Sequence, residues 1–120
     1  MPTQSADLLP IDAAYETLIQ RQWDHLAKPG VWLDGERRVA IAQAGRDARR
    51  GVTPRVPLQA VMVEATRKLT IEPATIDQPW IDTVVGDGLD HLVLLEVMSI
   101  CARLSAIDTF LFGVGHPERP

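Results

Sequence analysis

The chain has 120 residues, of which 46% are hydrophobic and 23% are charged, and its formal net charge is −4. This length and composition fit one compact domain over residues 1–120, with residues 1–10 and 114–120 expected as extended tails. An acidic chain lacks the basic surface that binds phosphate groups, which argues against nucleic acid as a partner. No apolar segment follows a charged N-terminus, so nothing resembles a secretory signal and we expect a cytoplasmic protein.

The first half of the chain carries two helical patterns. Over residues 12–28 apolar side chains recur every three or four positions, which predicts an amphipathic helix that ends at Pro29 and Gly30. A second helix is predicted over residues 35–50, with Asp34 as its N-cap and Gly51 as its end.

Half of the 12 basic residues lie in or just after this second helix: Arg37, Arg38, Arg46, Arg49, Arg50 and Arg55. We expect them to form a solvated helix face that pairs with acidic neighbours such as Glu36 and Asp47. A site for an acidic small molecule is the alternative.

Two further helices are predicted in the middle of the chain. One covers residues 58–69, after a loop bracketed by Pro54 and Pro57, and ends before Pro73. A short helix over residues 78–85 starts at Thr75 or Asp77, either of which can cap it.

The last long stretch, residues 90–113, is apolar on nearly every side, and Asp90 is its predicted N-cap. Its length would suit a membrane span, but Glu96, Arg103 and Asp108 lie inside it, and each costs about 2.5–3.5 kcal/mol near the centre of such a helix. We therefore predict a core helix and no membrane partner. Its apolar surface exceeds what so small a chain needs to cover, so we expect a homo-oligomer formed through this helix.

No segment shows the alternation typical of a strand, so the expected fold class is all-α. The fold is predicted to be a compact bundle of about five main helices with the long apolar C-terminal helix at its centre. Trp23, Trp32 and Trp80 come from three different segments and are expected to anchor the core.

Three segments, taken in order, resemble a known superfamily. They read WDHLAKPGVWLDGERRVAIAQAGRDAR, VMVEATRKL and PWIDTVVGDGLDHLVLLEVMSICARLSAIDTFLFGVG. Their order and spacing resemble the carboxymuconolactone decarboxylase and alkylhydroperoxidase D superfamily, particularly a bacterial branch. The resemblance implies an alkylhydroperoxidase D-like, all-helical fold that assembles into dimers, trimers or hexamers.

The chain departs from this superfamily at the residues that carry peroxidase chemistry. The peroxidase branch uses a C-x-x-C pair with a nearby glutamate and histidine, which together generate a thiolate and then a disulfide. In the register that the resemblance implies, Ala44 stands in place of the glutamate, with Gly51 and Pro54 in place of the two cysteines. Cysteine-pair peroxidase activity is therefore not expected. The decarboxylase branch does not need the pair, but its substrate-binding residues have no match in this chain.

Three residues of the last helix are the candidate catalytic residues: Glu96, His91 and Cys101. Glu96 lies either on an exposed stripe with Arg103 or in the interior with a partner. His91 is expected to be a solvated residue of the first turn. Cys101 is expected to be a packing residue, because a free cysteine in an apolar helix behaves as a small hydrophobe.

Three functions from different classes remain open. The first is a degenerate, non-peroxidase member of the superfamily that retains its fold and assembly. The second is a cysteine-independent decarboxylase- or isomerase-type enzyme that uses Glu96 as a proton-transfer base at a subunit interface. The third is a small-molecule-binding or partner module that pairs with a catalytic homologue. No cofactor or metal is expected, since His25 and His116 form no metal-ligand spacing with the other candidates.

Overall fold

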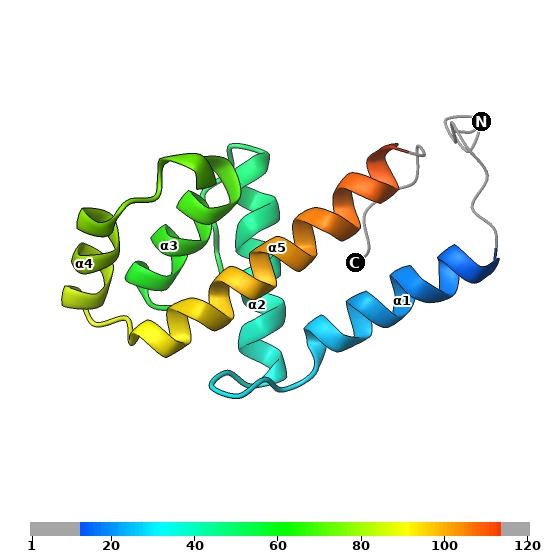
Figure 1. The fold of residues 1–120 in the computed structure, drawn as a ribbon, viewed down its shortest axis with the longest axis horizontal. Helices are drawn as coiled ribbons and strands as arrows, with labels where there is room; N and C mark the ends of the chain where they lie inside the picture. Colours follow the sequence, from blue (N-terminus) through cyan, green and yellow to red (C-terminus); the bar gives the residue numbers. More distant parts are fainter. Residues whose placement is uncertain (1–12, 114–120) are drawn as a thin grey trace.

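The structure, a computed structural model, describes residues 13–113, and all regular structure in this part of the chain is helical, as predicted (Figure 1). The helices are α1 (Ala13–Ala27), α2 (Gly35–Arg49), α3 (Ala60–Ile71), α4 (Gln78–Gly86) and α5 (His91–Gly113), with one short 3₁₀ turn, η2 (Pro73–Thr75), between α3 and α4. The predicted tails at 1–10 and 114–120 lie outside the described residues.

Aspartate side chains begin three of the helices where the sequence predicted them. Asp34 and Asp77 each accept a hydrogen bond from the backbone N–H three residues later, at 2.8 and 2.9 Å, and Asp90 accepts one from the N–H two residues later, at 2.8 Å. These bonds satisfy donors that the first turn of a helix leaves unpaired. α3 begins at Ala60 rather than at residue 58, because Leu58 still belongs to the preceding loop.

α5 is the central helix of the fold (Figure 1). It lies against α1, α2 and α3. Its buried apolar side chains recur along its whole length: Leu94, Val97, Ile100, Cys101, Leu104, Ile107 and Leu111. Neighbours on several sides explain why this helix needs a wider apolar surface than an ordinary amphipathic helix. Within residues 13–113, no helix combines the length and the apolar character that a bilayer crossing requires.

α1 is the least buried of the long helices. It runs antiparallel to α5, and the two extend away from the α2, α3 and α4 region (Figure 1). Only Leu26, near the C-terminal end of α1, is buried. Tyr15 and Leu18, two of the recurring apolar residues of this helix, are 54% and 50% exposed. The apolar stripe exists as predicted, but no described segment covers its first half.

Candidate functional site

Glu96 lies in the interior, in an ion pair with Arg38. The Nη1 atom of Arg38 is 2.9 Å from Oε2 of Glu96, and the two side chains are only 6% and 7% exposed. Arg38 also donates from Nε to the carbonyl oxygen of Leu26 at 2.8 Å, which ties α2 to the end of α1. The backbone N–H of Trp32 donates to Oε1 of Glu96 at 2.8 Å. Of the two positions predicted for Glu96, the interior one is therefore correct.

The loop between α1 and α2 closes over this ion pair. The N–H of Gly30 donates to the carbonyl oxygen of Leu33 at 2.8 Å, which forms a tight turn. A Cβ atom at Gly30 would lie 2.1 Å from Oε2 of Glu96 and 2.7 Å from Nη1 of Arg38. Glycine is needed at this position because any side chain would push the ion pair apart.

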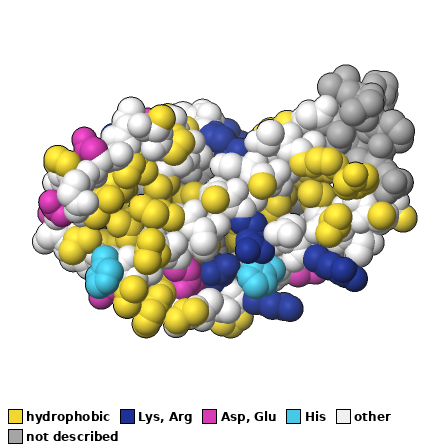
Figure 2. Space-filling view, in the orientation of Figure 1, with side chains coloured by type: hydrophobic (Ala, Val, Ile, Leu, Met, Phe, Trp, Pro, Cys, Tyr) yellow, Lys and Arg dark blue, Asp and Glu magenta, His cyan; other side chains and the backbone are white. Residues whose placement is uncertain are grey.

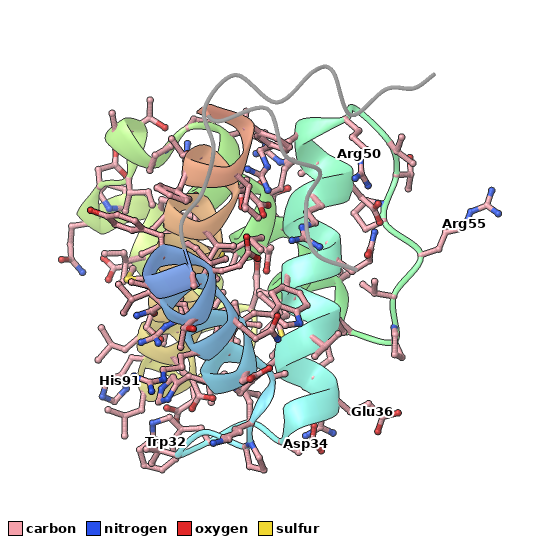
Figure 3. All side chains as sticks on the ribbon, turned by 90° about the vertical axis from the view of Figure 1, so that its right-hand side faces the viewer. Trp32, Asp34, Glu36, Arg50, Arg55 and His91 are labelled. Atoms are coloured by element: carbon pink, nitrogen blue, oxygen red, sulfur yellow. The ribbon has the colours of Figure 1, made fainter. Side chains whose placement is uncertain are left out.

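An open pocket of about 610 Å³ lies over the ion pair, between the end of α1, the α1–α2 loop and the N-terminal half of α5. Arg38 and Glu96 line its base, and His25 and Arg103 line its sides. Apolar lining comes from Val31, Trp32, Leu92 and Leu95. Figure 2 shows histidine, basic and hydrophobic side chains gathered on this face. Figure 3 shows Trp32 at the end of the molecule where the loop turns into α2.

A second buried ionic cluster lies further along α5. Asp108 is fully buried and accepts hydrogen bonds from Nε and Nη2 of Arg46, at 3.1 and 2.9 Å, and from Nη2 of Arg49. The guanidinium carbon of Arg46 lies 4.9 Å from the ring centre of Trp23, which is a cation–π geometry. Through these contacts the cluster joins α1, α2 and α5.

The predicted solvated arginine face is therefore wrong for Arg38 and Arg46. These residues are eight positions apart, so they lie on the same side of α2, and that side faces α5. Each reaches a carboxylate on α5 and is about 5% exposed or less. Arg50 and Arg55 are exposed, and Figure 3 shows Arg55 directed away from the body of the protein.

Cys101 is in the core, as expected of a packing residue. Its side chain is 4% exposed, and its nearest polar partner is the hydroxyl of Thr70, 3.9 Å from the sulfur. Burial raises the pKa of the Cys101 thiol to about 11. The thiol is therefore protonated at neutral pH and is a poor nucleophile.

The three candidate residues of α5 do not form one site. His91 is exposed in the first turn, as expected, and lines neither the pocket nor the core, while Cys101 is buried deeper in the fold. Only Glu96 reaches the pocket. His25, which was considered above as a metal ligand, also lines the pocket, from the end of α1. No local pattern in the sequence marks His25, because the pocket brings it together with residues of the α1–α2 loop and α5 only in the folded chain.

The tryptophans divide into two groups. Trp23 and Trp80 pack against the core as predicted, whereas Trp32 is 50% exposed, so its predicted core position is wrong. Its backbone is held by Glu96, which leaves the indole at the pocket instead.

No group of three or more histidine, cysteine, aspartate or glutamate side chains comes together as possible metal ligands within residues 13–113, and His116 lies outside this range. The two positions where the resemblance implies the cysteine pair are Gly51 and Pro54, so neither carries a thiol. The arrangement at the pocket can bind and orient a molecule. The donor groups of His25 and Arg103 at its sides suit an acceptor-rich ligand.

Comparison of the chain with protein-family models, with curated proteins and with solved structures finds no match. Membership of the alkylhydroperoxidase D superfamily therefore stays a prediction from the sequence segments given above.

Proposed function

We propose that this chain is a non-peroxidase, alkylhydroperoxidase D-like protein that assembles with copies of itself through α1 and α5. The observation that carries this proposal is an uncovered apolar groove between these two helices. The groove has a volume of about 660 Å³. A cytoplasmic location and the lack of a nucleic-acid partner remain predictions that accompany the proposal.

The groove is nearly free of charge. Its walls include Tyr15 and Leu18 from α1 and Ala106 and Phe110 from α5, and the rings of Tyr15 and Phe110 stack at 5.9 Å. Arg103 is the one side chain with a full charge among the lining residues. Half-exposed apolar side chains in a row are costly in water, at about 25 cal/mol for each Å² of apolar surface, which favours a partner that covers them.

A second copy of the chain is the occupant that the groove fits best. α1 and α5 are antiparallel neighbours, so a two-fold axis beside the groove would place the same helix pair against itself (Figure 1). The product would be a four-helix arrangement with Leu18 and Phe110 of both copies in its interior. Because the groove has little charge, this self-pairing meets little electrostatic repulsion.

Catalytic alternatives find less support. Thiol chemistry would need Cys101 as a thiolate, and burial keeps it protonated. The proton-transfer base proposed for an isomerase or decarboxylase would be Glu96, but both of its oxygens already accept hydrogen bonds, from Arg38 and from the Trp32 N–H. These contacts hold α2 and the α1–α2 loop against α5, so the geometry favours a structural and binding role for Glu96.

Sedimentation velocity over a range of protein concentrations tests the assembly. We expect the wild-type chain to be oligomeric and Leu18→Glu to be monomeric, because the variant places a carboxylate in the centre of the interface. Val52→Glu is the matched control, since Val52 is 53% exposed, much like Leu18, but lies in the loop after α2. A wild-type chain that stays monomeric at about 100 µM, where even weak oligomers assemble, would contradict the proposal. Thiol-dependent peroxide turnover by the purified protein would contradict its non-peroxidase part.

A further inference from the structure

The pocket over the Arg38–Glu96 pair carries an inference beyond assembly. We propose that it binds a small organic acid, with the carboxylate of the ligand at Arg103 and His25 and an apolar or aromatic body against Trp32 and Leu95. The residues of this binding site all belong to a single chain, and two of them, Ser99 and Arg103, also line the groove between α1 and α5.

The charge of the pocket selects an anion. Arg38 is neutralised by Glu96, so these two residues add no net charge. Arg103 makes one hydrogen bond within residues 13–113, to the side-chain oxygen of Gln22 at 3.0 Å, and no ion pair there. Its guanidinium has five N–H donors, so most of them remain available to a ligand. His25 adds at least one ring N–H in every protonation state.

A cationic ligand finds no comparable partner in this pocket. Glu96 is the one acidic side chain among the lining residues. Its Oε2 is bound to Arg38 and its Oε1 to the N–H of Trp32. A ligand ammonium group would have to share these oxygens with Arg38 and the Trp32 N–H, and it would also face the positive charge of Arg103.

The size and the walls of the pocket suit an organic body rather than an inorganic ion. A volume of about 610 Å³ falls within the range of about 300–1,000 Å³ that is typical of small-molecule sites. Val31, Trp32 and Leu95 are 82%, 50% and 58% exposed. A flat apolar ligand would cover these side chains, and the exposed Trp32 indole offers it a face for stacking.

The buried ion pair gives the pocket a fixed shape before a ligand arrives. Glu96 holds the Trp32 backbone, Arg38 holds the end of α1 through Leu26, and Gly30 lets the loop lie directly on the pair. A loop held at Trp32 and packed directly on the ion pair loses little conformational freedom when a ligand binds, which favours affinity.

The test uses three probes of similar shape and different charge: naphthaleneacetate, the neutral alcohol naphthaleneethanol and the corresponding naphthyl ammonium compound. Binding to the isotopically labelled full chain is followed by NMR, using the indole N–H of Trp32 as the reporter. We expect the carboxylate to bind about tenfold or more tightly than the alcohol and the ammonium compound not to bind, as for a charge-assisted contact.

Arg103→Gln should remove the advantage of the carboxylate over the alcohol and leave the affinity for the alcohol unchanged. Arg21→Gln is the control, since Arg21 is exposed on α1 and does not line the pocket. Leu95→Asp should abolish binding of both the acid and the alcohol.

Three results would each overturn the proposal. They are equal binding of the acid and the alcohol, no shift of the Trp32 indole signal with the acid, and an Arg103→Gln variant that keeps the wild-type preference for the acid. Repeating the titration on the Leu18→Glu variant separates the two proposals, because the pocket is built from one chain and the monomeric variant should still bind the acid.

Discussion

At the scale of single residues, the Arg38–Glu96 pair is stable only as long as both charges are present. Each charge pays a desolvation penalty when it leaves water, and in a site this dry the opposite charge and the surrounding hydrogen bonds offset that penalty. Three hydrogen bonds hold the pair: from Nε and Nη1 of Arg38, and from the N–H of Trp32. Removing one partner leaves the other as a buried, uncompensated charge.

We therefore predict that Glu96→Gln lowers the free energy of unfolding by about 3–5 kcal/mol, the loss typical of a broken buried pair. Glutamine keeps the shape of the side chain and can still accept from Trp32, so the loss isolates the missing charge. Glu64→Gln is the matched control, because Glu64 pairs with Arg67 at the surface, where the side chains are 50% and 39% exposed. It should cost about 1 kcal/mol or less in urea unfolding.

The double variant Arg38→Met/Glu96→Leu should recover at least half of that loss, since it removes both charges and keeps apolar volume. Equal effects of Glu96→Gln and Glu64→Gln would show that the buried pair does not stabilise the fold in this way.

Ionisation of the Cys101 thiol makes the free energy of unfolding depend on pH in the alkaline range. Burial raises the pKa of its thiol from the ordinary 9.0 to about 11. Between these two pH values the unfolded chain has lost the thiol proton while the folded chain keeps it. The contribution of the protonated thiol to the free energy of unfolding is therefore complete below pH 9.0 and falls as pH rises towards about 11. A pKa difference of this size corresponds to about 2–3 kcal/mol at most.

Between about pH 8 and about pH 11, the free energy of unfolding of the wild type should therefore fall further than that of Cys101→Ala, by up to this amount. Other groups titrate in both proteins and cancel in the comparison. Parallel pH profiles of the two proteins in urea unfolding would argue that the Cys101 thiol ionises equally in the folded and unfolded chains.

What the sequence could predict at this scale depends on distance along the chain. The caps at Asp34, Asp77 and Asp90 act on N–H groups two or three residues away, so local reasoning placed them correctly. The partner of Glu96 lies 58 residues earlier, on another helix. Which of several arginines reaches it depends on how α2 crosses α5, and no local pattern contains that information.

At the scale of elements, α5 and α1 differ in how far other helices cover them. Periodicity correctly identified both helices and the apolar side of each. It does not tell whether another element covers that side. α5 is covered by α1, α2 and α3, whereas α1 is buried only at Leu26. Tyr15 and Leu18 are therefore about half exposed in the single chain, at the groove where we propose that a second copy binds.

Because α1 is less buried than α5, we predict that its backbone amides exchange hydrogen faster. In the monomeric Leu18→Glu variant, backbone amides of the first half of α1 should exchange at rates close to those of an unfolded chain, because local opening there exposes few buried contacts. Amides of Val97 to Leu104 in α5 should exchange only on global unfolding. Mass-spectrometric exchange on peptides from the two helices makes the comparison, and equal protection of both would show that α1 is held more firmly than its burial indicates.

At the scale of the whole molecule, uncovered apolar side chains lie along α1, the α1–α2 loop and α5. The groove and the pocket are neighbours on this surface and share Ser99 and Arg103. The sequence predicted an excess of apolar surface and attributed it to α5 alone. The excess is in fact shared between α5, α1 and the loop, which sequence analysis could not foresee because these segments meet only in the folded chain.

If a second copy covers the groove, folding and assembly are linked, and the melting temperature must depend on protein concentration. For a dimer that unfolds to two separate chains, a rise from about 5 µM to about 500 µM adds about 2.7 kcal/mol per dimer. Spread over two chains of 120 residues, this raises the melting temperature by about 5 °C. Leu18→Glu should melt at the same temperature at both concentrations, and Val52→Glu should behave like the wild type. Calorimetry at the two concentrations measures all three proteins. A wild-type melting temperature that does not change with concentration would mean that the α1–α5 groove is exposed in the native protein.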